Sequence, residues 1–96
     1  MNRHNDKDIK DLVSGFINQY KLKSKYIEFK IREYWTEEMS PMVNRYTTEI
    51  KVVDKKLIVN ISSASMKHEL HLDRTKLKDQ INVFLEEDFL VEVLVK

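Results

Sequence analysis

The chain has 96 residues, of which 42% are apolar and 34% are charged, so it suits one globular domain with a strongly hydrated surface. Its 17 Lys and Arg nearly balance 16 Asp and Glu, so net charge alone indicates neither a nucleic-acid partner nor a membrane partner. The absence of cysteine excludes disulfides, thiolate metal sites and a cysteine nucleophile. The N-terminus lacks the apolar run of a signal peptide, and no stretch is long enough to span a membrane, so we expect a cytoplasmic protein.

Two helices are predicted for the N-terminal half, after a flexible tail over residues 1–5. The first, over Asp6–Tyr20, repeats its apolar residues at helical spacing. The basic stretch YKLKSKY is expected to join it to a second helix over Ser24–Met39, in which Trp35 anchors the core. Pro41 ends this helix, because a residue before proline avoids helical backbone angles, and it opens a short further helical turn, PMVNRY.

Two strands follow, TTEIKVV and KLIVNIS. Apolar and polar residues alternate along them, and the intervening VDKK predicts an antiparallel hairpin. The turn lacks the favoured Asn-Gly or Asp-Gly pair, so its type stays open. The second strand runs into a serine-rich turn, where Ser62 or Ser63 is predicted to cap the next helix.

The next apolar pattern covers SASMKHELHLDRTKLKDQINVFLEE, as one long helix or as two segments kinked near Asp73–Thr75. The chain closes with FLVEVLV, a strand that a right-handed crossover places parallel to the second strand. The predicted fold is α+β, in the order helix-helix-strand-strand-helix-strand, with a three-stranded mixed sheet and helices packed on one face. Candidates for the open face of the sheet are Lys51, Ile58, Asn60 and Leu94.

The sequence carries no convincing catalytic constellation. The serine-rich turn lacks the glycines that let a backbone cradle a phosphate. His68 and His71 lie three residues apart without an HExxH motif or an evident third ligand, so they are interpreted as solvent-facing. We expect no catalytic residue, metal, cofactor or small-molecule substrate. A hydrolase that uses His68 and Glu69 remains an alternative, and it would require a deep pocket around them.

The basic stretch of the first two predicted helices is the more informative feature. Residues 21–32 hold five cations and one anion, Glu28, a local charge of 5 − 1 = +4. Tyr20 and Tyr26 lie among these cations and could stack on bases, or they could be buried beside a solvated connection. A second set of cations could form a stripe only if the fold brings its members together: Arg45, Lys51, Lys67, Arg74 and Lys78. The candidate contacts to a nucleic-acid backbone are Lys21, Lys23, Lys25, Lys30, Arg32, Arg45, Lys67 and Arg74.

Three segments, WTEEMSPMVNRYT, KLIVNISSASMKHEL and VEVLVK, together resemble the bacterial DciA-type domain. The chain departs from that family where Ser40 stands in place of the usual Gly and where Asp54–Lys55 replaces an Asn-Gly-like turn. Ser65 also stands where an aromatic residue is frequent. The positions that carry the resemblance are Trp35, Val43, Tyr46, Thr47, Leu57, Val59, Ser62, Ser63, Glu69 and Leu70.

This resemblance implies a single KH-like domain over residues 6–96 that is not an enzyme. It also implies non-specific binding to single- or double-stranded DNA, and assistance to the replicative helicase in DNA replication. The chain has no GxxG loop, so the base clamping of true KH modules is not expected. The alternative is a protein–protein interaction module without nucleic-acid binding, such as a homo-oligomer that pairs its edge strand or open sheet face.

Overall fold

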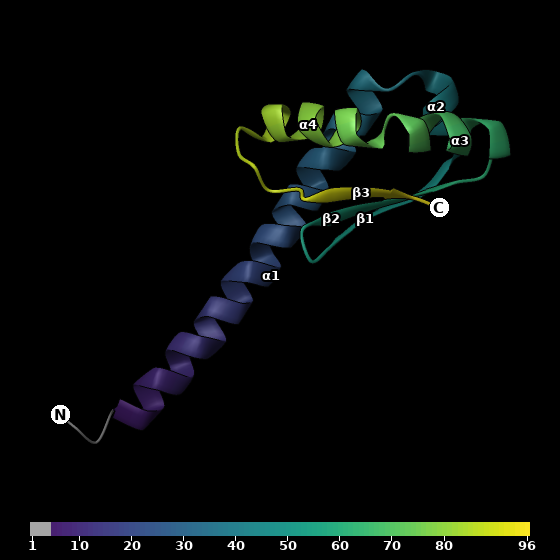
Figure 1. Ribbon diagram of the computed structural model, residues 1–96. Coiled ribbons are helices and arrows are strands. Elements are labelled where there is room, and N and C mark those ends of the chain that lie inside the picture. The colour runs from purple at the N-terminus through teal and green to yellow at the C-terminus, as the bar shows by residue number, and fades with distance from the viewer. Residues whose placement is uncertain (1–4) are drawn as a thin grey trace.

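The computed structural model describes the backbone of residues 5–96 and the side chains of residues 19–96. The tail predicted for residues 1–5 lies outside the described residues, apart from Asn5, where the first helix begins. The fold class is the predicted one, α+β with a three-stranded mixed sheet (Figure 1). The elements in chain order are α1 (Asn5–Glu38), α2 (Pro41–Tyr46), β1 (Thr47–Val53), β2 (Lys56–Ile61), α3 (Ala64–Leu72), α4 (Arg74–Leu85) and β3 (Glu92–Val95).

The prediction of two helices joined at YKLKSKY is wrong, because α1 runs through this stretch without a break. The stretch contains neither glycine nor proline, and its Lys and Leu residues are good helix formers. Tyr20 and Ile27 are seven residues apart, about two helical turns, so the apolar stripes of the two predicted helices share one face. Nothing in the local sequence therefore ends the helix at Tyr20.

A short helix closes the C-terminal end of α1. The Ser40 hydroxyl accepts a hydrogen bond from the Val43 N–H at 3.1 Å, and Pro41 occupies the first turn of α2, as predicted. The Asn44 amide donates to the carbonyls of Trp35 at 3.1 Å and of Met39 at 3.2 Å. The bond to Met39 satisfies a carbonyl that the end of the helix leaves without a backbone partner, while the Trp35 carbonyl also accepts from the Met39 N–H at 3.2 Å.

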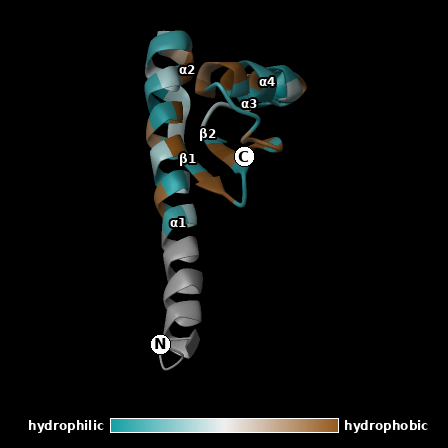
Figure 2. Ribbon diagram, turned by 90° about the vertical axis from the view of Figure 1, so that its left-hand side faces the viewer, coloured by the Kyte–Doolittle hydropathy of each residue, from teal (hydrophilic) through white to brown (hydrophobic). Residues whose placement is uncertain are grey.

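The sheet has the order β1-β2-β3, with β2 antiparallel to β1 and parallel to β3, as the crossover predicted. Ile50 pairs with Val59, and both side chains are buried on the helix-covered face. The register places Lys51 opposite Ile58 on the other pleat, and the four residues predicted for the open face all lie on that pleat. Figure 2 shows β1 as the strand beside α1.

The hairpin turn that the sequence left open is built from two left-handed residues. Asp54 has φ 51° and Lys55 has φ 63°. Positive φ at both central positions is the geometry of a type I′ turn, which matches the twist of the two strands. A lysine in this conformation brings its Cβ close to the backbone and costs about 1–2 kcal/mol relative to glycine.

The long C-terminal helix region is kinked as one alternative predicted. The α3 helix ends at Leu72 and α4 begins at Arg74, with Asp73 between them. Ser63 is the residue that caps α3, since its hydroxyl accepts from the Met66 N–H at 3.4 Å. The serine-rich turn therefore starts a helix, as predicted. The Asp73 side chain makes no capping hydrogen bond to α4.

Trp35 anchors the core, as predicted. It is 1% exposed, and its indole Nε1 donates to the Thr47 hydroxyl at 2.9 Å. The Thr47 hydroxyl in turn donates to the Val43 carbonyl at 2.6 Å. This chain of bonds satisfies the one polar atom of the buried indole and ties α1 to the start of β1.

A buried amide holds the segment that enters β3. Asn82 of α4 donates from Nδ2 to the Leu90 carbonyl at 2.9 Å, and its Oδ1 accepts from the Leu90 N–H at 2.9 Å. Phe89 and Leu90 are buried although β3, predicted over residues 89–95, begins only at Glu92. Among the residues that the structure describes, no helix combines the length and hydropathy needed to cross a membrane.

Candidate nucleic-acid interface

The five candidate cations of α1 divide between two sides of the helix. At about 3.6 residues per turn, Lys21 and Lys25 share a side with Arg32, while Lys23 and Lys30 lie on the opposite side. Arg32 contacts β1, so we call its side the β1 flank. Lys23 and Lys30 contact residues of α4 and of the segment that follows it, so we call their side the α4 flank.

The two lysines of the α4 flank are engaged within the molecule. Lys23 Nζ lies 3.0 Å from Glu87 Oε2 and 5.9 Å from the centre of the Phe89 ring. Lys30 Nζ lies 5.2 Å from the centre of the Phe84 ring. Cation–π contacts and ion pairs of this kind help hold α1 against α4. A phosphate would have to compete with these partners.

On the β1 flank, Arg32 and Glu28 cover the free edge of the sheet. Arg32 Nη2 pairs with Glu28 Oε1 at 2.9 Å and donates to the Ile50 carbonyl at 2.6 Å. Glu28 Oε2 accepts from the Val52 N–H at 3.1 Å. The pair therefore satisfies backbone groups that an edge strand would otherwise expose. This role of Arg32 was not predictable from the sequence, because it depends on β1 lying beside α1.

Of the five candidate cations of α1, Lys21 and Lys25 remain available. Both are exposed, and neither has an ion-pair partner among residues 19–96. Tyr26 is 60% exposed and Tyr20 is 38% exposed, so the alternative that these rings are buried is wrong. This part of α1 presents positive charge on the β1 flank and an accessible aromatic ring, Tyr26, on the adjoining outward face.

The remaining candidates lie on other elements and are exposed. Arg45 is in the last turn of α2, where the Ser62 N–H donates to the Tyr46 carbonyl at 2.8 Å, so it sits near the end of β2. Lys67 follows on α3. Arg74 opens α4 and donates to the His71 carbonyl at 2.8 Å.

Lys23 of α1 is instead near the start of β2, whereas Arg32 contacts Ile50, which pairs with Val59 in the second half of β2. Lys23 pairs with Glu87, and the Val91 N–H of the segment after Glu87 donates to the Lys55 carbonyl at 2.9 Å. The fold therefore places Lys23 apart from Arg45, Lys67 and Arg74 and does not gather the eight candidates into one stripe. Lys51 and Lys78 do not join the groups into one, since each pairs with a neighbouring carboxylate, Glu49 or Asp79, at 3.1 Å.

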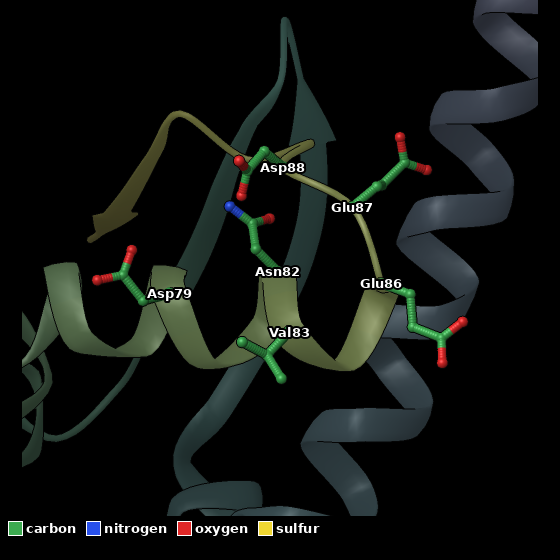
Figure 3. A pocket seen from close by; sticks show the side chains of 6 residues that line it. All are labelled: Asp79, Asn82, Val83, Glu86, Glu87 and Asp88. Carbon is green, nitrogen blue, oxygen red and sulfur yellow. The ribbon is translucent and has the colours of Figure 1, made fainter.

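An acidic hollow marks the end of α4, with a volume of about 510 Å³ (Figure 3). The side chains of Glu86 and Glu87 point away from it in Figure 3, so its carboxylates do not converge on one point. Across the described part of the chain, no group of three or more His, Asp and Glu residues is placed to hold a metal ion. The residues that line the hollow are Asp79, Asn82, Val83, Glu86, Glu87 and Asp88. Its carboxylates repel phosphate, so the β1 flank of α1 is the more favourable side for a nucleic acid.

The hydrolase alternative is contradicted by the geometry. It requires a deep pocket around His68 and Glu69, and both residues are exposed on α3. His71 is exposed as well, in agreement with the interpretation of the two histidines as solvent-facing.

A family model described as "Dna[CI] antecedent, DciA" matches residues 8–95. The chain belongs to the DciA family. No curated protein and no solved structure matches it. The DciA family is involved in loading the replicative helicase in DNA replication, and it is not a known enzyme family.

Several positions on which the sequence resemblance rests have structural roles here. Trp35 and Thr47 form the hydrogen-bonded core contact between α1 and β1. Ser63 caps α3, and Leu57 and Val59 are fully buried in β2. These positions therefore help to hold the fold together, while the candidate cations lie on other positions.

Proposed function

We propose that this DciA-family protein binds the nucleic-acid backbone without sequence preference, through Lys21 and Lys25 on the β1 flank of α1, and assists the replicative helicase. Membership of the DciA family carries the replication part of the proposal. Two observations support contact with nucleic-acid phosphates. Both lysines are exposed, and neither has an ion-pair partner among the described residues. Residues 6–96 act as a single domain of KH-like type in this proposal.

Lysine suits binding of this kind because its ammonium group is a compact point charge. It attracts a phosphate without fixing the orientation of the bases, so contacts of this kind carry no sequence information. Binding releases the cations condensed on the nucleic acid, and affinity therefore falls as the salt concentration rises. Tyr26 can add stacking on an unpaired base, which predicts tighter binding to single strands than to duplexes.

The other candidate cations contribute less to nucleic-acid binding in this proposal. Lys23 and Lys30 already contact Glu87 and aromatic rings, and Arg32 covers the edge of β1. Arg45, Lys67 and Arg74 lie toward the other end of β2, where they could meet only a longer nucleic acid.

Fluorescence anisotropy with labelled oligonucleotides tests the binding. We expect binding to single-stranded and duplex DNA of unrelated sequences at low salt, with tighter binding to single strands and a loss of affinity at higher salt. Tyr26→Ala should reduce the preference for single strands. Absence of binding at low salt would refute the proposal and favour the protein–protein interaction module.

The helicase part needs a separate measurement. The chain, fixed to a resin, is incubated with purified replicative helicase with and without nuclease treatment. Retention of helicase after nuclease treatment supports a direct contact, and retention only before treatment indicates a bridge of DNA. Failure to retain helicase under both conditions would refute this part and leave the DNA-binding part standing.

A further inference from the structure

The outward face of α1 carries exposed apolar side chains. Leu22 is 66% exposed, and Tyr26 and Phe29 are each 60% exposed, although all three lie in the middle of a long helix. They recur at spacings of four and three residues, so they line one stripe opposite the buried Ile27 and Ile31. A contiguous apolar stripe on a solvent-facing helix indicates an interaction surface.

Charges on either side of this stripe follow a definite order along a ridge that winds obliquely across it. Every fourth residue from Lys21 to Glu37 forms one ridge of the helix surface, which is about 24 Å long at 1.5 Å per residue. The ridge is positive at its N-terminal end, aromatic at its centre and negative at its C-terminal end. Its members in order are Lys21, Lys25, Phe29, Glu33 and Glu37.

We propose that this face of α1 binds the same face of a second copy of the chain, antiparallel, about a two-fold axis that passes near Phe29. Lys21 and Glu37 lie eight residues on either side of Phe29, and Lys25 and Glu33 lie four residues on either side of it. An axis at Phe29 therefore sets the ridge against itself with opposite charges aligned. Lys21 then faces Glu37 of the second copy, and the two Phe29 rings meet at the centre. A parallel arrangement would instead set lysine against lysine and glutamate against glutamate.

The local shape of the ridge suits this partner. Phe29, Arg32, Glu33, Thr36 and Glu37 line a shallow hollow of about 330 Å³ beside the proposed axis. An antiparallel copy brings an aromatic side chain, Phe29 or Tyr26, over this hollow. The charge order excludes an equally good fit for a helix that is uniformly basic or uniformly acidic, so it favours self-recognition.

The contact is expected to be weak and reversible. A single pair of helices about 24 Å long provides less surface than a standard protein–protein interface, so the dimer should form in the micromolar range or above. Lys21 and Lys25 also belong to the proposed nucleic-acid surface, so DNA should compete with the dimer. The dimer itself is measured without DNA, and its test is therefore independent of the proposed function.

Charge reversal with sedimentation equilibrium provides the test. We expect the wild-type chain to approach the dimer mass as its concentration rises to several hundred micromolar. The variants Glu33→Lys/Glu37→Lys and Lys21→Glu/Lys25→Glu should each weaken self-association at least about tenfold, because every attractive contact across the axis becomes a repulsion. An equimolar mixture of the two variants should dimerise again, because one chain is then positive and the other negative along the ridge.

The outcomes separate the proposal from other arrangements. Circular dichroism checks that each variant is folded, as expected for substitutions on the surface. A wild-type chain that stays monomeric over the whole concentration range would overturn the proposal. Dimers that persist in both variants would also overturn it, because they would place the interface elsewhere, for example on the sheet. Restored dimerisation in the mixture would establish this face as the interface, and a wild-type dimer that both variants weaken would establish the antiparallel order, because a parallel pair already sets like charges together in the wild type.

Discussion

Asn82→Ala is expected to destabilise the fold more than any surface substitution on α4, because its amide is the partner of both backbone groups of Leu90. Asn82 is 7% exposed and Leu90 is 3% exposed, and the two hydrogen bonds between them are each 2.9 Å long. Alanine leaves a buried N–H and a buried carbonyl without partners. Each unsatisfied buried group costs about 1–3 kcal/mol, so the two together should cost about 2–6 kcal/mol.

Urea denaturation followed by the fluorescence of Trp35, the only tryptophan, measures this loss. Asp79→Ala is the matched control, since Asp79 lies on the same helix beside the same hollow but is exposed, and its loss should stay within about 0.5 kcal/mol. Asn82→Asp retains the acceptor but loses the donor and buries a negative charge, so at neutral pH it should be at least as unstable as Asn82→Ala. An Asn82→Ala free energy of unfolding equal to that of Asp79→Ala would refute the reasoning.

Three smaller effects follow from local geometry. Lys55→Gly should raise the free energy of unfolding by about 0.5–1 kcal/mol, since glycine adopts the positive φ without strain, and no gain in the urea midpoint would contradict the turn assignment. Thr47→Val should cost about 1–3 kcal/mol in the same assay, because the buried indole N–H loses its acceptor. Burial, and secondarily the charge of Glu38, raises the pKa of Tyr34 above its ordinary value near 10. The stabilising effect of the neutral phenol is therefore complete below pH 10 and is lost as pH rises through the folded-state pKa. Above pH 10, the free energy of unfolding should fall less steeply with pH in Tyr34→Phe than in the wild type. An unchanged pH dependence would contradict the assignment of this effect to Tyr34.

The sequence predicted the elements whose signals are local. The alternation of apolar and polar residues located β1 and β2, and the serine-rich turn located the start of α3. Pro41 correctly ended α1 and opened α2, and the crossover rule correctly made β3 parallel to β2. The kink at Asp73 was one of two alternatives that the pattern allowed.

The features that were missed depend on contacts between elements distant in the chain. The break between two helices at YKLKSKY was predicted because the stretch is basic, but it contains no residue that ends a helix, and α1 continues through it. Arg32 was grouped with the free cations because its partner, the carbonyl of Ile50, becomes its neighbour only when β1 packs beside α1. The role of Asn82 likewise depends on the return of the chain at Leu90, which has no periodic signal.

The candidate site was predictable in composition but not in arrangement. Counting cations identified residues 21–32, yet one helix presents those cations on two flanks with different neighbours. Lys23 and Lys25 are equivalent in the sequence, and only the fold engages the first with Glu87 and leaves the second exposed.

The salt dependence of duplex binding by two matched double variants tests this account most directly. Lys21→Gln/Lys25→Gln removes two cations from the β1 flank, and Lys23→Gln/Lys30→Gln removes two from the α4 flank of the same helix. Each lost phosphate contact should reduce the slope of log K against log salt by about 0.9, so the first variant should lose about 1.8 and the second much less. Equal changes in the two variants, or a larger change in the second, would contradict the assignment of nucleic-acid binding to Lys21 and Lys25.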